Sequence, residues 1–116
     1  MLYKALARGE AVGLLPDQAP GVGEGVWADF FGRPAYTMTL VRRLQQMSRA
    51  AVIMAFAERL QEGHGYRLHL EELPTDRLDE AALNRAIEEQ VRRCPAQYLW
   101  SYNRFKVPAG APPPEP

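Results

Sequence analysis

The sequence predicts an α/β fold with a small, mainly parallel sheet and helices on its faces. Residues 11–15 and 51–56 are short, continuous apolar runs with the length of buried strands. Between them, residues 40–47 repeat apolar side chains at helical spacing. A strand, a helix and a strand in this order indicate a right-handed parallel crossover.

The remaining elements follow in chain order. Residues 2–8 are expected to form a helix end, and residues 16–34, rich in Gly and Pro, a long loop. Thr37 is expected to cap the central helix. Alternation over residues 66–71 indicates a strand antiparallel to 51–56, and residues 79–94 form an amphipathic helix. Pro95 permits a further helical turn, and the Pro-rich tail over residues 108–116 is expected to be disordered.

Composition and charge exclude several classes of protein. The chain has 14 basic residues (Lys and Arg) and 14 acidic residues (Asp and Glu), so its formal net charge is zero. A neutral chain is not typical of a general nucleic-acid binder. Cys94 is the single cysteine, so neither an internal disulfide nor a Cys-based zinc site is expected, and a reducing compartment is favoured. No apolar run approaches the roughly 20 residues that a spanning helix needs.

A three- or four-stranded sheet with helices leaves a long edge unpaired. The chain also begins inside a predicted helix without a cap, so we expect a further segment to precede Met1. Apolar surface around Leu14, Val52, Ile53 and Leu68 should then be exposed. The isolated chain is therefore expected to self-associate, most simply as a twofold homo-oligomer.

Four stretches in a fixed order indicate a family. They are GEAVGLLPDQ at 9–18, GVWADFFGRP at 25–34, AVIMAFAER at 51–59 with GYRL at 65–68, and CPAQYLWSYNRFK at 94–106. Together they resemble the lauroyl and myristoyl acyltransferases of lipid A synthesis, in the lysophospholipid acyltransferase superfamily. The resemblance implies that residues 1–107 are the C-terminal part of an acyltransferase domain with a glycerolipid acyltransferase-like fold.

The resemblance also implies an activity. The parent protein would move a fatty acyl group from an acyl carrier protein thioester, or alternatively from coenzyme A, to a hydroxyl of a lipid A precursor. It would work at the cytoplasmic face of the bacterial inner membrane, reaching the membrane surface through an N-terminal part absent here. No cofactor is implied.

Family members carry a catalytic His separated by four residues from an Asp or Glu, because a hydroxyl that attacks a thioester must lose its proton. Five positions after His64 stands His69, and five after His69 stands Pro74. The motif is absent, so the chain alone is expected to be inactive. With two histidines and one cysteine, a metal site is not expected either.

Asp17 and Gln18 follow a predicted strand, where open α/β sheets place their ligands. By resemblance they help to hold the acceptor; the alternative is a turn aspartate that caps backbone donors. Trp27, Phe30 and Phe31 could line an acyl-chain tunnel or form a hairpin lid that packs on its own core.

Arg104 could bind phosphate groups or an acidic carrier protein. The alternative for Arg104 is a structural role. For the neighbouring Arg92 and Arg93, the preferred interpretation is that they are solvated at the C-terminal end of a helix, where positive charge is favoured. A different class of function is a non-catalytic module that binds lipid or an acidic partner through this basic C-terminal patch.

Overall fold

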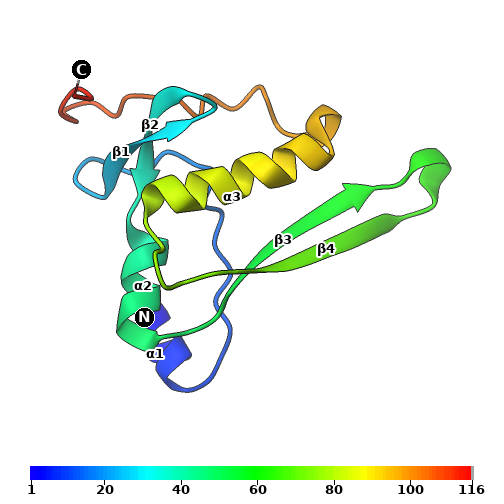
Figure 1. Cartoon of the computed structure of the whole chain (residues 1–116), viewed down its shortest axis with the longest axis horizontal. Coiled ribbons are helices and arrows are strands. Elements are labelled where there is room, and N and C mark those ends of the chain that lie inside the picture. The colour runs from blue at the N-terminus through cyan, green and yellow to red at the C-terminus, as the bar shows by residue number, and fades with distance from the viewer. Residues whose placement is uncertain (116) are drawn as a thin grey trace.

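The computed structural model describes residues 1–115, which form two β-hairpins and three helices (Figure 1). Two 3₁₀ turns, Gln61–Gly63 and Pro95–Gln97, complete the described elements. In chain order the main elements are α1 (Leu2–Ala7), β1 (Gly25–Phe30), β2 (Arg33–Met38), α2 (Leu40–Ser48), β3 (Val52–Arg59), β4 (Tyr66–Leu73) and α3 (Glu80–Arg93).

Each hairpin is an antiparallel two-stranded sheet. β1 pairs with β2, from Gly25 opposite Met38 to Phe30 opposite Arg33. The turn between them places Phe31 at φ 50° and Gly32 at φ 74°. Two successive positive φ values are typical of the tight turns whose twist matches that of the flanking strands.

β3 pairs with β4 in the second sheet, from Val52 opposite Leu73 to Arg59 opposite Tyr66. The predicted strand at 51–56 and its antiparallel partner at 66–71 are therefore confirmed. Figure 1 shows this hairpin extending away from the rest of the molecule as a long ribbon.

The expectation of a mainly parallel sheet is wrong, although the α/β class is confirmed. α2 leads from β2 of the first hairpin to β3 of the second, so it is no crossover within one sheet. Residues 11–15 join no strand pairing in the described chain. Their composition is that of a buried strand, but a ladder also needs a partner strand, and none lies beside them here.

Two further expectations are corrected. Thr37 lies within β2, and Thr39 precedes α2 without a side-chain capping bond. Part of the predicted long loop at 16–34 forms β1 and the hairpin turn. The sequence did not predict β1 or the hairpin turn, because β1 mixes aromatic and small residues that do not alternate strictly.

The core lies between α3 and the two hairpins. The stripe predicted for α3 is confirmed, because Leu83, Ile87 and Val91 are buried. They belong to one cluster that also contains Phe30, Ala35, Val41, Met54 and Leu78. α3 packs across β1 and β2, so it fixes the first hairpin relative to the start of the second (Figure 1).

The C-terminal segment returns over the first hairpin. Pro108 is buried, and the Pro112 carbonyl accepts a hydrogen bond of 2.7 Å from Trp27 Nε1. Pro116 lies outside the described residues, and the disorder of residues 108–116 stays a prediction. None of the helices in the described chain is long and apolar enough to cross a membrane.

The start of α3 offers a test of local stability. The Asp79 carboxylate accepts a 2.7 Å hydrogen bond from the Ala82 backbone N–H and so caps the helix. We expect Asp79→Ala to lower the free energy of unfolding by about 1 kcal/mol in urea denaturation. Asp76→Ala, which removes another exposed carboxylate just before the helix, should change it by less than about 0.5 kcal/mol. Equal losses in both variants would show that the cap contributes nothing.

Candidate functional site

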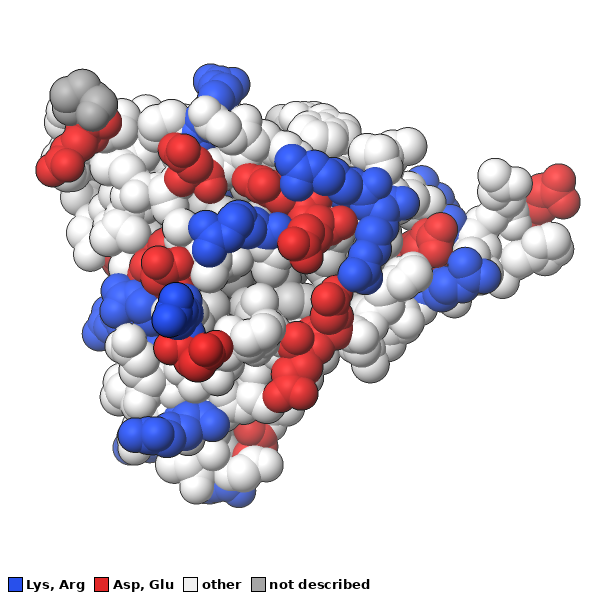
Figure 2. Space-filling view, viewed as in Figure 1, with Lys and Arg blue, Asp and Glu red and all other residues white. Residues whose placement is uncertain are grey.

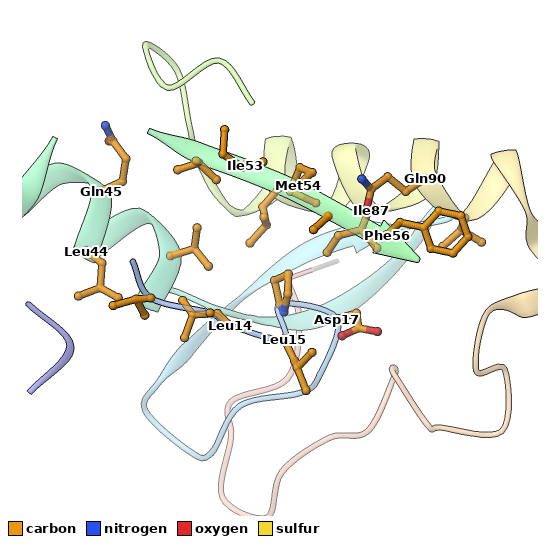
Figure 3. Close-up of a pocket in the computed structure, with 18 of the residues that line it drawn as sticks. Leu14, Leu15, Asp17, Leu44, Gln45, Ile53, Met54, Phe56, Ile87 and Gln90 are labelled. Carbon is orange, nitrogen blue, oxygen red and sulfur yellow. The ribbon is translucent and has the colours of Figure 1, made fainter. Parts of the chain in front are cut away.

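An apolar cavity of about 530 Å³ lies between β3, α2, α3 and the segment at residues 12–17 (Figure 3). Its wall is contributed mainly by aliphatic side chains of these elements, including Leu14, Leu44, Val52, Met54, Ile87 and Val91. Asp17 is the one acidic residue in the lining, which contains no Lys or Arg. A cavity of this character suits an apolar occupant with a polar group at one end.

Asp17 lies in the turn that follows the apolar run, half-buried at the wall of the cavity. Figure 3 shows it at the opposite end from Leu44 and Gln45. Tyr98 also lines the cavity, and burial together with the charge of Asp17 raises the pKa of its phenol. Gln18 is exposed and does not line the cavity, and its contact with the acceptor stays a prediction.

The three predicted aromatic residues belong to the first hairpin and do not line this cavity. Phe30 is buried in the core, with its ring centroid 4.7 Å from that of Phe31. Phe31 lies 6.0 Å from Trp100, while Trp27 meets Tyr36 edge-on at 5.2 Å. This is the hairpin packing foreseen as one alternative; contact with an acyl chain stays a prediction.

Arg104 is almost completely buried, with 2% of its surface exposed. Its Nη1 donates a 2.7 Å hydrogen bond to the Tyr36 carbonyl, and its Nη2 donates to Thr37 Oγ1 at 2.9 Å and to Asn84 Oδ1 at 3.3 Å. Asn84 Nδ2 in turn donates to Thr37 Oγ1 at 2.9 Å and to the Ala28 and Asp29 carbonyls. One guanidinium thus joins the C-terminal segment to the first hairpin and to α3.

The electrostatics of Arg104 are unusual because no carboxylate forms an ion pair with it within the described chain. Burial lowers the pKa of its guanidinium, and the charges of Tyr98, Tyr102 and Asp17 oppose that shift. The guanidinium carbon lies 5.5 Å from the Phe30 ring centroid, a favourable cation–π position. Because its Nη donors serve internal acceptors, Arg104 is placed as a positioning group, and direct substrate contact stays a prediction.

Sequence reasoning missed a His–Glu pair on the β3–β4 ribbon. His69 Nε2 lies 3.0 Å from Glu58 Oε2, and the imidazole stacks on Phe56 at 5.5 Å. The strand register could have predicted this pair. Phe56 faces His69 across the hairpin, and Glu58 follows two residues later on the same face. The His69 side chain is only partly exposed.

The basic residues near the end of α3 are paired with acids. Arg92 lies 3.4 Å from Glu88, and Arg93 lies 2.7 Å from Glu71. Figure 2 shows acidic and basic groups interspersed on this face of the molecule, without a continuous basic patch. No cluster of three or more potential metal ligands occurs among the residues that the structure describes.

The buried network predicts a large effect of one substitution. Arg104→Met should lower the free energy of unfolding by about 2–4 kcal/mol, because it leaves Asn84, Thr37 and the Tyr36 carbonyl without a buried partner. The matched control is Arg92→Met, which removes an exposed arginine and should cost less than about 0.5 kcal/mol. Chemical denaturation of both variants provides the measurement, and similar stabilities would rule out a structural role for Arg104.

The sequence of this chain matches a known protein family. The family model for bacterial lipid A biosynthesis acyltransferases matches residues 1–107. The chain is 38% identical over 109 residues to the lipid A biosynthesis palmitoleoyltransferase of Escherichia coli K12, covering 89% of this chain and 36% of that protein. It is 33% identical over 121 residues to the lipid A biosynthesis lauroyltransferase of the same organism, and the match covers 96% of this chain and 39% of that protein.

A lipid A biosynthesis acyltransferase of Haemophilus influenzae is 32% identical over 97 residues, which cover 80% of this chain and 30% of that protein. The chain therefore spans only 30% to 39% of the length of these relatives. The resemblance read from the four sequence stretches is confirmed over nearly the whole chain. On this evidence the chain belongs to the bacterial lipid A biosynthesis acyltransferase family.

Proposed function

We propose that this chain works as part of an acyltransferase that moves a fatty acyl group from an acyl carrier protein thioester to a hydroxyl of a lipid A precursor. Coenzyme A is the alternative donor. The observation that carries the proposal is the family match over residues 1–107, together with relatives named for palmitoleoyl and lauroyl transfer. The reaction would take place at the cytoplasmic face of the bacterial inner membrane.

In the proposed reaction, this chain and the rest of such an enzyme supply different groups. An attacking hydroxyl needs a base within hydrogen-bond reach. His64 and His69 lack the spacing to an acidic residue that the family uses, and His69 is already held by Glu58 on the outer ribbon. We infer that the base comes from the part of the fold that this chain does not span, and that the chain alone is inactive.

Within this chain, we assign Asp17 to the acceptor. It lies at the end of an apolar segment, and its carboxylate can accept a hydrogen bond from a sugar hydroxyl. Gln18, which is exposed beside it, would make a second contact. Trp27, Phe30 and Phe31 remain the proposed contacts to the acyl chain, and Arg104 positions the hairpin that carries them.

A second candidate is a non-catalytic module that holds a lipid. The apolar cavity favours this alternative, since its lining is largely aliphatic. The proposed basic patch weakens it, because Arg92 and Arg93 are both engaged with glutamates. Binding of a fatty acid by this chain, without transfer in any context, would favour the module over the enzyme.

The role of Asp17 can be tested in a chimera that places this chain in the E. coli K12 palmitoleoyltransferase, in place of the matching segment. We expect the chimera to transfer palmitoleate from its carrier thioester to a lipid A precursor. Asp17→Ala should raise the activation free energy by about 2–4 kcal/mol, roughly a 30- to 1,000-fold loss of rate.

The control is Asp29→Ala, which removes an exposed carboxylate on β1 and should leave the rate within twofold. The isolated chain should give no turnover above a heat-killed sample. If Asp17→Ala retained half the activity, Asp17 would be only a turn residue. Turnover by the isolated chain would overturn the assignment of the base to another part of the enzyme.

We also propose that the isolated chain self-associates. One face of the β3–β4 ribbon exposes apolar side chains, with Ile53 51%, Leu68 62%, Leu70 63% and Tyr66 71% exposed. A twofold contact through this face would be expected to bury about 1,600 Å² in total if it is specific. The formal net charge of zero offers little repulsion against it.

Light scattering at micromolar concentration should report a dimer, and the double substitution Leu68→Glu with Leu70→Glu should restore the monomer. Both side chains are exposed, so their replacement removes little core packing. Val107→Glu, at another exposed apolar position, is the control and should leave the dimer intact. A monomeric parent chain would contradict the proposal.

A further inference from the structure

The cavity is bordered by the unpaired edge of β3. In the described chain β3 pairs with β4 alone, so its second edge has no partner strand. Every residue from 50 to 56 lines the cavity, so residues from both faces of the strand contribute to this wall, as expected where a strand turns its edge toward a cavity. An unpaired strand edge presents a row of free N–H and C=O groups and is a template for a further strand.

The opposite wall of the cavity is also formed by an extended segment without a partner strand in the described chain. Every residue from 12 to 17 lines the cavity. Val12 and Leu14 are half-buried, whereas Ala11, Gly13 and Leu15 are exposed, which is the alternating burial of a strand that covers a core with one face. Within the described residues, the backbone of 11–18 makes no hydrogen bond to other backbone groups. This segment behaves as a strand whose partner is missing.

Backbone groups of these two segments need hydrogen-bond partners wherever an occupant of the cavity covers them, because burial without a hydrogen bond is costly. Figure 3 shows Leu14 and Leu15 on one side of the cavity and Ile53, Met54 and Phe56 of β3 on the other. A single strand inserted between these two segments would satisfy both rows of backbone groups at once. Its side chains would meet Leu44, Ile87 and Val91 and would therefore be apolar.

We infer that the cavity is the binding slot for one additional apolar β-strand, hydrogen-bonded on one side to β3 and on the other to residues 12–15. The occupant belongs to the portion of the family's chain that this chain does not span, since the match covers only 36% of the E. coli palmitoleoyltransferase. The inserted strand would join the segment at 11–15, β3 and β4 into one sheet. This inference concerns assembly and does not rest on the proposed acyl transfer.

Two other occupants fit less well. A fatty acyl chain has no backbone donors or acceptors, so it would leave both edges unpaired. A second copy that pairs β3 with β3 would satisfy one edge and leave residues 12–15 without partners. Only an inserted strand satisfies both walls.

Hydrogen–deuterium exchange resolved to single residues provides the test. Because N–H groups of an antiparallel strand alternate between its two edges, half of the β3 amides should be bonded to β4 and half should face the slot. In the isolated chain at a concentration where it is monomeric, the slot-facing amides of β3 and those of residues 12–15 should exchange fast. In the chimera with the E. coli palmitoleoyltransferase, the same amides should exchange at least about tenfold more slowly.

Proline substitutions isolate the backbone contribution. Neighbouring residues of a strand point their N–H groups to opposite edges, so either Gly13→Pro or Leu14→Pro must remove a slot-facing donor. That variant should lose the added protection on β3 in the chimera, while Gly13→Ala and Leu14→Ala retain it. A Cβ at Gly13 meets no atom within 4 Å, so the alanine control there is not strained by its surroundings.

Three outcomes would overturn the inference. The first is equal protection of both β3 edges in the isolated monomer. The second is unchanged exchange of these amides in a folded chimera, or in a mixture of this chain with the remaining palmitoleoyltransferase polypeptide if the chimera does not fold. The third is protection that appears with palmitoleic acid alone, or with increasing concentration of this chain alone. An inactive chimera that shows the protection would support the strand slot and count only against the proposed acyl transfer.

Discussion

The arrangement of this chain depends on one buried cation. Arg104 donates from both terminal nitrogens to the Tyr36 carbonyl, Thr37 and Asn84, and these belong to the first hairpin and to α3. Taking a guanidinium out of water costs several kcal/mol unless its donors are satisfied. Three hydrogen bonds from the terminal nitrogens and the Phe30 ring offset much of that cost without a carboxylate, while the buried Nε has no hydrogen-bond partner among the described residues. A charge held by neutral acceptors at several fixed points tolerates little movement, so this network sets the relative positions of three segments far apart in sequence.

The position of the cavity follows from that network. Asn84 faces the first hairpin from α3, while Leu83, Ile87 and Val91 of the same helix are buried or line the cavity. Fixing one face of α3 against β1 and β2 therefore fixes the face that is turned toward β3. The Asp79 cap defines where the helix begins, and so which turn of it reaches the cavity. The polar network around Arg104 and the apolar wall of the cavity therefore involve two faces of the same helix, α3.

Sequence periodicity predicted the elements whose signal is local. α3 and β4 were predictable because their apolar positions recur with a clear period, and β3 was predictable because it contains a continuous apolar run of strand length. The prediction of a mainly parallel sheet was wrong, because residues 11–15 have the composition of a buried strand, whereas pairing depends on a partner that composition cannot supply. Asp17 follows an apolar run, as the sequence shows, and lies at the wall of the cavity, while its contact with substrate stays a prediction. The burial of Arg104 was not predicted, since nothing local distinguishes an arginine near the end of a chain from a solvated one.

The strand slot also bears on where substrates would bind. A strand that fills the cavity leaves no room there for an acyl chain, so the cavity and the acyl site must be different places. The proposed role of Asp17 is compatible with this arrangement, because Asp17 follows residues 12–15 at the end of the completed sheet. Open α/β sheets place their ligands beyond the carboxyl ends of their strands. An acceptor bound there would lie near Tyr98, which touches both the cavity and the aromatic cluster around Phe30. The completed sheet would thus bring Asp17 and the first hairpin to one edge, with Tyr98 between them.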